Sequence, residues 1–372
     1  MANILDYLNW RGDLAVTSDP FNEVDALILA RLVYTPFDVM SPGPADNPFT
    51  IREAATALLA LPDIEQDMLS PEDVDLLRAL IDSDRFGDMM LSNYVNIIEK
   101  DTETQFAAMT VDIGDQLRFI SFRGTDDTLV GWKENFNMSF TCPVPAQKSA
   151  LHYLEHVAES GNGRLVAGGH SKGGNHAQYA AACCPEKTQE RIACVYSFDG
   201  PGFDRKILAR PGFARMRDRM FTYMPQSSIV GMLMEPAGKC IVVNSSGKRK
   251  YKQHDVYTWD LTRNHLSYLD SVTAESLLLD HTITEWLTEI ELDRREKVID
   301  AVYTAIAECE LDSLKEFDEQ RFRAVLNFLS SISNLDKETR KLITGSLTAL
   351  ARHWRENRKL KEEWLKEEKG DK

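Results

Sequence analysis

The stretch from Arg164 to Tyr179 constrains the fold of this chain more than any other part of the sequence. A short apolar run leads into the pentapeptide Gly-His-Ser-Lys-Gly, which has Ser171 at its centre. An alanine-rich segment follows and closes before Pro185. Strand, sharp turn and helix in this order are the setting of a nucleophile elbow. We expect a strained backbone at Ser171 and a hydroxyl that points out at the carboxyl end of the sheet.

The pentapeptide is a weak signal when taken alone. The pattern G-x-S-x-G also arises by chance, as a glycine-rich turn with an incidental serine. The predicted strand before it and the predicted helix after it favour the elbow, because that motif is defined by its strand–turn–helix setting.

Strands and helices alternate around this stretch, which predicts a mostly parallel sheet with helices on both faces. We expect a hairpin at the edge of that sheet, a helix at 144–160, and three further strands. The predicted strands are Gln105–Ile113 and Gln116–Phe122 for the hairpin, then Ile192–Phe198, Phe221–Met224 and, as the last, Cys240–Asn244. Thr125, Ser171, Asp199, Gln226 and His254 each follow a strand in this reading, so they should meet at one sheet edge.

Helical patterns occur in the sequence both before and after the predicted strands. Helices are predicted at Glu23–Tyr34, Ile51–Leu61 and Pro71–Asp82. Beyond about residue 270 the chain becomes helical and charged, with apolar faces such as the one that contains Val298 and Val302. We divide the chain into a domain over 1–285, whose first 90 residues are a helical part packed on it, and a C-terminal helical extension over 286–372.

The charge of the chain excludes several classes of partner. The formal net charge is −15, whereas binding to nucleic acid or to anionic lipid needs a basic face. The six cysteines have no C-x-x-C spacing, so neither a zinc site nor a disulfide framework is indicated. No segment resembles a signal peptide or a membrane span. We expect a cytoplasmic protein with no integral membrane contact.

A serine nucleophile needs a base, an acid that orients the base, and an oxyanion hole. His254 follows the last predicted strand and is the favoured base, although a surface histidine would look the same. The rival is His265, which looks more like the start of a helix. His170 would point sideways from the elbow, and His176 on the next helix would pack or be solvated.

The acid has several candidates. Asp199 ends the strand after the elbow helix and is our choice, although Asp-Gly-Pro-Gly is a strong turn sequence in its own right. The next strand ends in Pro-Gln-Ser-Ser and offers no carboxylate. Asp255, Asp260 and Glu235 remain as substitutes.

The oxyanion hole is predicted from Thr125, which can offer its backbone N–H and its hydroxyl, together with the backbone N–H of Lys172. A second motif, His152 to His156, matches H-x-x-E-H, which could hold zinc on a helix. No third ligand is evident, so we read it as helix polar residues and expect neither a metal nor a cofactor.

The residues also resemble a known group of proteins. Phe-Arg-Gly-Thr, a tryptophan soon after it, Gly-His-Ser-x-Gly and a strand that ends in a Gly-Pro turn resemble the class 3 lipases of the α/β-hydrolase superfamily. The chain is still more similar to a bacterial family of lipase-like proteins, over most of residues 1–285. The segments that carry this similarity are 6–13, 122–127, 169–175, 199–203, 225–232 and 253–255.

The resemblance implies an α/β-hydrolase fold with Ser171 as nucleophile and Thr125 in the oxyanion hole. Class 3 lipases carry their acid after the strand that follows the Gly-Pro turn, where this chain has Gln226 to Val230. Either the acid has moved to Asp199 or the triad is incomplete.

We therefore expect a serine hydrolase of the carboxylesterase or lipase type, acting on a small-molecule acyl ester or thioester through Ser171, His254 and Asp199. The alternative is a catalytically weak or inactive hydrolase scaffold that binds a protein partner through its C-terminal helices.

Overall fold

The structure is a computed structural model of the 372-residue chain. It describes residues 2–45, 47–99, 101, 104–114, 116–125, 138, 142–248, 250–289 and, toward the C-terminus, 337, 340–341, 344–346, 348–349 and 351–357. Most of the described residues up to Val272 form one compact unit, and those from Thr273 onward belong to a second.

A mixed sheet forms the centre of the first unit. Among the described residues its order is β1-β2-β3-β4-β5-β6-β7-β8-β11, and β4 to β8 run parallel. Antiparallel pairs join β1 to β2, β3 to β4 and β8 to β11. The bounds are β1 Phe49–Thr50, β2 Met90–Glu99, β3 Thr104–Gly114, β4 Leu117–Phe122, β5 Arg164–His170, β6 Ile192–Phe198, β7 Met220–Pro225, β8 Lys239–Val243 and β11 Tyr268–Leu269. The predicted α/β class with parallel central strands is confirmed.

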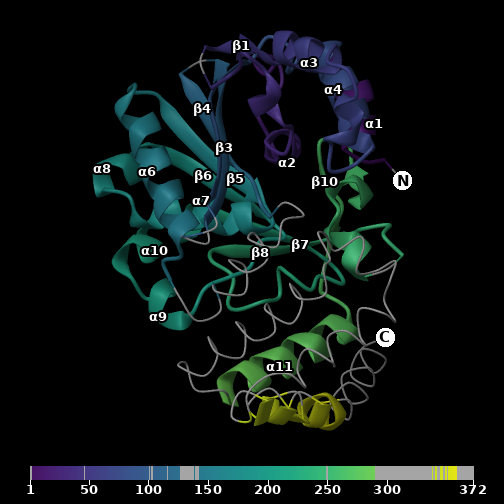
Figure 1. Ribbon diagram of the computed structural model, residues 1–372, viewed down its shortest axis with the longest axis vertical. Helices are drawn as coiled ribbons and strands as arrows, with labels where there is room; N and C mark the ends of the chain where they lie inside the picture. Colours follow the sequence, from purple (N-terminus) through teal and green to yellow (C-terminus); the bar gives the residue numbers. More distant parts are fainter. Residues whose placement is uncertain are drawn as a thin grey trace. The chain divides into compact units, whose positions relative to one another are not determined.

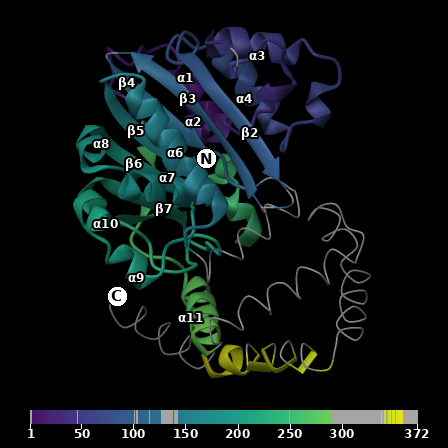
Figure 2. The same cartoon turned by 60° about the vertical axis from the view of Figure 1, so that its left-hand side comes forward.

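Two predictions about the sheet edges were wrong. The β3–β4 hairpin is not at an edge, because β2 and β1 continue the sheet beyond β3, and Figure 2 shows β2 lying beside β3. Strand β8 is not the last, because β11 pairs with it. None of the three added strands has a clear sequence signal: β2 alternates poorly and is largely exposed toward its end, and β1 and β11 have only two residues each.

Helices cover both faces of the sheet (Figure 1). On one face α2 packs against β4, β5 and β6, and on the other α7 does the same, with α6 beside it. The helices of this unit are α1 Ile4–Arg11, α2 Glu23–Leu32, α3 Ile51–Leu59, α4 Glu72–Ile81, α6 Pro145–Glu159, α7 Lys172–Cys183, α8 Glu186–Arg191, α9 Arg205–Leu208 and α10 Pro211–Met216. The helices predicted near residues 23–34, 51–61, 71–82 and 144–160 are confirmed.

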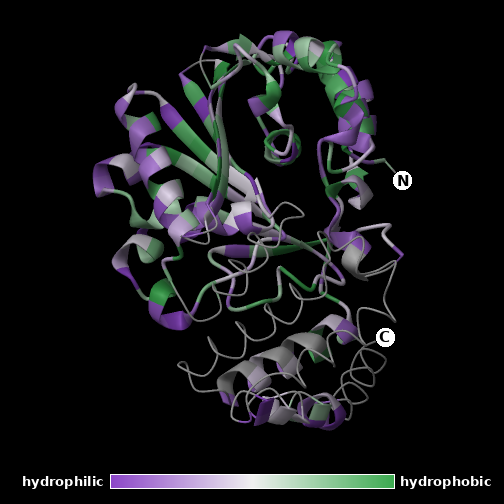
Figure 3. Ribbon diagram, viewed as in Figure 1, coloured by the Kyte–Doolittle hydropathy of each residue, from purple (hydrophilic) through white to green (hydrophobic). Residues whose placement is uncertain are grey.

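Strand β4 shows how alternation divides the two faces. The hydroxyl of Ser121 donates to the carbonyl of Leu29 in α2, whereas the ring of Phe122 lies 6.0 Å from that of Tyr153 in α6. Successive side chains of a strand point to opposite faces, so both layers are held by the same short segment. Figure 3 shows hydrophobic residues concentrated on α2 and the strands, and hydrophilic ones on the outer helices α6 and α8.

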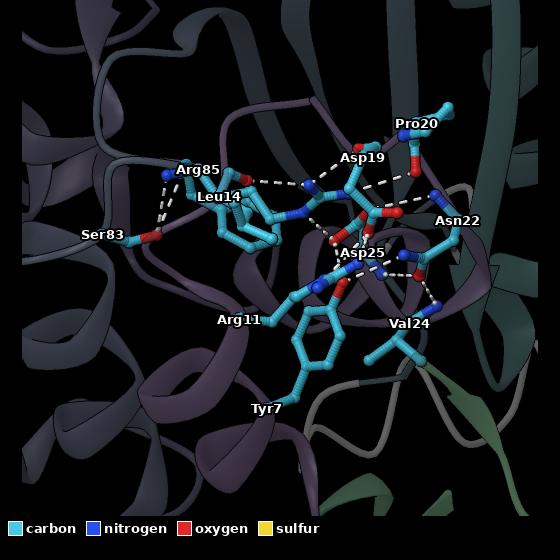
Figure 4. Close-up of polar contacts among 11 residues, drawn as sticks. Tyr7, Arg11, Leu14, Asp19, Pro20, Asn22, Val24, Asp25, Ser83 and Arg85 are labelled. Atoms are coloured by element: carbon cyan, nitrogen blue, oxygen red, sulfur yellow. Dashed lines mark hydrogen bonds and ion pairs between the residues drawn. The ribbon is translucent and has the colours of Figure 1, made fainter. Parts of the chain in front are cut away.

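A buried polar network fixes the N-terminal helices. Arg85 donates from Nε to Asp25 of α2 at 2.7 Å, and Tyr7 of α1 donates to the same carboxylate at 3.0 Å. Asn22 caps α2 and reaches the Tyr7 hydroxyl (Figure 4). The Arg85–Asp25 pair has no exposed side-chain surface. Removing either charge would therefore leave the other buried without a counter-ion.

Short elements complete the first unit, and they include the segment that carries His254. The 3₁₀ turns are η1 Phe37–Val39, η2 Ile64–Gln66, η3 Arg217–Arg219, η4 Lys250–His254 and η5 Val256–Thr258, and a small ladder pairs β9 Leu261–Thr262 with β10 His265–Leu266. His265 thus lies in a strand, and its interpretation as a helix start was wrong: its partner Thr262 closes a tight hairpin.

The second unit contains α11 Ala274–Glu289. Within it, Trp286 donates from Nε1 to the carbonyl of Ser346 at 2.9 Å, and Asn357 donates to Glu285 at 2.7 Å. The helical character predicted beyond residue 270 is confirmed for α11 and for 351–357. The apolar face predicted at Val298 and Val302 lies outside the described residues. None of the helices described has the length and apolar character needed to cross a membrane.

Candidate active site

Ser171 occupies the turn between β5 and α7, and its backbone is strained. Its φ is 58° and its ψ −134°, a conformation that residues with a side chain rarely adopt. The strand–turn–helix setting predicted from the pentapeptide is confirmed. Two glycines make the turn possible: a Cβ would lie 2.0 Å from the carbonyl oxygen of Phe122 at Gly173, and 2.4 Å from it at Gly169.

The backbone around Ser171 is tied to the neighbouring strand. Its N–H donates to the carbonyl of Phe198 in β6 at 2.8 Å, and its own carbonyl accepts from Gly174 in the first turn of α7 at 2.9 Å. The residue therefore stands at the positive end of the α7 dipole, which favours negative charge nearby.

Asp199 directly follows β6 and is fully buried. Its Oδ1 accepts two hydrogen bonds, from the hydroxyl of Ser228 at 2.5 Å and from the N–H of Gly231 at 3.1 Å. Its Oδ2 lies 2.6 Å from Nδ1 of His254. One oxygen is thus held by the loop after β7, and the other faces the imidazole.

This arrangement accounts for the missing carboxylate after β7. The loop there supplies a hydroxyl and an N–H instead, and both point at the carboxylate that ends the preceding strand. Gly231 is needed for this approach, because a Cβ there would lie 2.4 Å from Oδ1 of Asp199. Ser228 and Gly231 therefore fix the position of the Asp199 side chain through two hydrogen bonds to one oxygen.

His254 ends η4 and leaves 29% of its side chain exposed. The adjacent Gln253 anchors the loop, since its Oε1 accepts from the N–H of Ser227 at 2.9 Å and its carbonyl accepts from Nε1 of Trp259 at 2.8 Å. Within the described part of the chain, the Ser171 hydroxyl and the His254 ring make no hydrogen bond to each other. Such bonds are often long without substrate and tighten in the reacting complex.

The other candidate acids are engaged elsewhere. Asp255 accepts from the N–H of Tyr257 and caps η5, and burial raises the pKa of its carboxyl. Asp260 accepts from the side chain of Asn244, and Glu235 pairs with an exposed arginine. In the described residues, Asp199 is the carboxylate that meets the His254 ring.

His265 and His176, two other histidines weighed as the base, have other surroundings. His265 stacks on Tyr268 and its Nδ1 lies 3.0 Å from the carbonyl of Leu266. His176 is buried in α7, and burial together with the nearby Lys172 ammonium lowers its pKa well below the usual value.

Gly124 and Thr125 follow β4, and Gly124 lies against the elbow. A Cβ on Gly124 would be 2.9 Å from Cβ of Ser171, so the predicted oxyanion loop touches the predicted nucleophile. The backbone of Lys172 opens α7 on the other side. Its side chain turns inward instead of toward the site, and its ammonium donates to Gln105 at 2.7 Å through Oε1 and 3.0 Å through the carbonyl.

Residues 80–304 match the family model described as Mbeg1-like, which is more than half of the chain. The chain belongs to the Mbeg1-like family. The predicted relationship to lipase-like proteins is thereby supported in its general form.

Comparisons with solved structures and with curated proteins add little to this family assignment. A solved structure titled as that of M37 lipase matches with 14% sequence identity and a TM-score of 0.34, over 56% of this chain and 67% of the other. A likeness that slight carries no conclusion about activity. The search of curated proteins found no significant match to the chain.

The sequence did not predict the contacts of three polar side chains around the site of this Mbeg1-like protein. Ser228 holds Asp199, while Tyr34 and His170 contact each other and reach Gly124 and His254. No spacing rule brings these residues together, because Tyr34 and His170 are 136 residues apart in the chain.

The H-x-x-E-H segment lies on α6, where His152 and His156 are exposed. The described residues contain no group of three or more His, Cys, Asp or Glu side chains placed to hold a metal ion.

Proposed function

We propose that this protein is a serine hydrolase that cleaves a carboxylic ester or thioester on an α/β-hydrolase fold. The observation that carries the proposal is the 2.6 Å contact between Asp199 Oδ2 and His254 Nδ1. It lies at the same sheet edge as Ser171, whose backbone is strained as a nucleophile elbow requires. A nucleophile, a base and an orienting acid in this chain order are the components of acyl transfer.

Acylation begins at Ser171. Its Oγ attacks the acyl carbonyl carbon while Nε2 of His254 takes the hydroxyl proton, which gives a tetrahedral oxyanion and an imidazolium. The ionised Asp199 faces Nδ1–H and stabilises the imidazolium. The imidazolium then gives its proton to the departing alcohol or thiol, which leaves an acyl-enzyme on Ser171.

Deacylation repeats these steps with water. His254 takes a proton from a water molecule, whose oxygen attacks the acyl carbonyl, and Ser171 leaves as its hydroxyl when the proton returns. The products are a carboxylic acid and the restored enzyme. No cofactor takes part in either half of this reaction.

The oxyanion is assigned to backbone donors. The N–H of Lys172 opens α7 beside Ser171, and Thr125 follows Gly124, which touches the elbow. Each donor of this kind stabilises the transition state by ~3 kcal/mol. The inward course of the Lys172 side chain supports a role for its backbone alone.

Labelling with a fluorophosphonate probe tests the proposal. We expect the wild-type protein to react and Ser171→Ala to be unlabelled, with Ser246→Ala, a change at an exposed serine, labelled as wild type. A panel of acyl esters and thioesters of increasing chain length would then identify the acyl group and leaving group.

Absence of Ser171-dependent labelling would refute the proposal that the protein is a serine hydrolase. It would leave the alternative, a hydrolase scaffold that binds a protein partner. The contacts of Asp199 argue against that alternative, because a buried carboxylate held by two donors and aimed at a histidine costs stability that a binding scaffold does not require.

A further inference from the structure

His170 immediately precedes the predicted nucleophile, and its ring contacts the predicted base. The ring is buried, and its Nε2 lies 2.8 Å from the backbone carbonyl oxygen of His254. The two imidazole rings are 4.5 Å apart between centroids. His170 therefore spans the gap between the elbow and the loop that carries His254.

The contacts of His170 define its tautomer. A carbonyl oxygen can only accept, so Nε2 of His170 carries the hydrogen and donates to His254. In the neutral ring Nδ1 is then an acceptor, and the hydroxyl of Tyr34 lies 3.2 Å from it. That hydroxyl in turn accepts from the N–H of Gly124 at 3.0 Å.

Tyr34 and His170 thus connect three loops that the reaction must hold in register. These are the oxyanion loop at Gly124, the elbow, and the loop of His254. The Tyr34 hydroxyl also lies 3.2 Å from the carbonyl oxygen of His170, so it contacts both the side chain and the backbone of the elbow. A Cβ on Gly124 would lie 2.2 Å from this hydroxyl, which shows how closely the groups pack.

The ring of His170 stays neutral. Burial lowers its pKa well below the usual value, and the neighbouring His254 and Arg31 lower it further. A neutral neighbour leaves His254 free to take up a proton without a second imidazolium beside it.

We propose that His170 is a positioning residue, which fixes the backbone of His254 so that its ring meets both Asp199 and Ser171. This inference rests on the proposed function. The ring of His254 is held by Asp199 at Nδ1, and its backbone is held by His170 at the carbonyl. With both contacts the ring has one orientation relative to the elbow; without the second, the loop can carry the ring away from Ser171.

Three variants test the role. His170→Leu removes the donor, and His170→Gln keeps a neutral N–H donor of similar reach. His176→Leu is the matched control, because His176 is also buried but lies on α7. Its ring packs beside Phe106 and not beside His254.

We expect His170→Leu to lower kcat on a p-nitrophenyl ester about 10- to 100-fold, because a displacement of about 1 Å at a reacting group costs that much. KM should stay within about twofold, since the contact does not bind substrate. His170→Gln should recover most of the loss, and His176→Leu should keep the wild-type kcat. Equal kcat in the His170→Leu and His176→Leu variants would overturn the proposal, as would a His170→Gln enzyme as slow as His170→Leu.

A failure of the proposed hydrolase function can be told apart from a failure of the role of His170, because in the first case the wild-type protein shows no Ser171-dependent labelling. Imidazole nitrogen NMR decides the geometry in either case. We expect the His170 signal, assigned by its loss in His170→Gln, to report a neutral ring with the hydrogen on Nε2 at pH 7. A hydrogen on Nδ1, or a protonated ring, would contradict the contact with His254.

Discussion

Replacing Asp199 by asparagine should abolish nearly all activity while leaving the fold intact. In the wild-type protein Oδ1 accepts from both Ser228 and Gly231, and Oδ2 faces His254. The amide oxygen of the asparagine must take the place of Oδ1, because an NH₂ group there would meet two donors. The NH₂ group is then forced toward Nδ1 of His254.

This orientation decides the size of the effect. An NH₂ group donates, so it selects the tautomer of His254 with a bare Nδ1 and the hydrogen on Nε2. That ring cannot accept the proton of Ser171. The wrong tautomer in a serine triad costs about 10⁴-fold in kcat, which corresponds to ~5 kcal/mol of barrier.

Steady-state kinetics on a p-nitrophenyl ester would measure the loss, with thermal unfolding as the check on folding. The matched control is Asp255→Asn, because Asp255 caps η5 and does not contact the ring of His254. We expect the control to stay within about twofold of wild type, because it changes the cap of η5 and leaves the contact between Asp199 and His254 in place. An Asp199→Asn protein that keeps more than about a tenth of the wild-type kcat would refute the assignment of the acid.

Four further changes have defined outcomes. Ser228→Ala should lower kcat about tenfold with little effect on KM, because the carboxylate loses its strongest donor. Gly124→Ala should inactivate and destabilise the protein, since its Cβ would lie 2.2 Å from a tyrosine hydroxyl, and the loss of labelling and a lower Tm would show it. Asp25→Ala should cost about 3–5 kcal/mol in chemical denaturation, because it leaves a fully buried guanidinium unpaired. His176 is buried with both ring nitrogens unbonded in the described part of the chain, and burial holds its pKa well below the usual value. Below about pH 6.5 the unfolded chain binds a proton at His176 that the folded state does not, so the free energy of unfolding decreases as the pH is lowered. His176→Leu should reduce that slope by up to ~1.4 kcal/mol per pH unit, measured by urea titrations at pH 7 and 5.5.

The local sequence pattern was sufficient to predict the elbow and the sheet edge at which the candidate site lies. The strand, the turn and the helix around Ser171 are each encoded by adjacent residues, and Gly169 and Gly173 leave the space that this turn needs. Because β4 to β8 run parallel, Thr125, Asp199 and His254 come to the same edge as Ser171.

Tertiary structure alone decided how those residues are held. The hydroxyl of Ser228 reaches a carboxylate 29 residues earlier in the chain, and that contact explains how Asp199 can face His254 although residues 226–230, directly after β7, contain no acid. The chain Gly124–Tyr34–His170–His254 likewise joins four separate segments. Periodicity tells which face of an element a side chain occupies. It does not tell which distant side chain it meets, because that depends on how the helices and loops pack across the sheet.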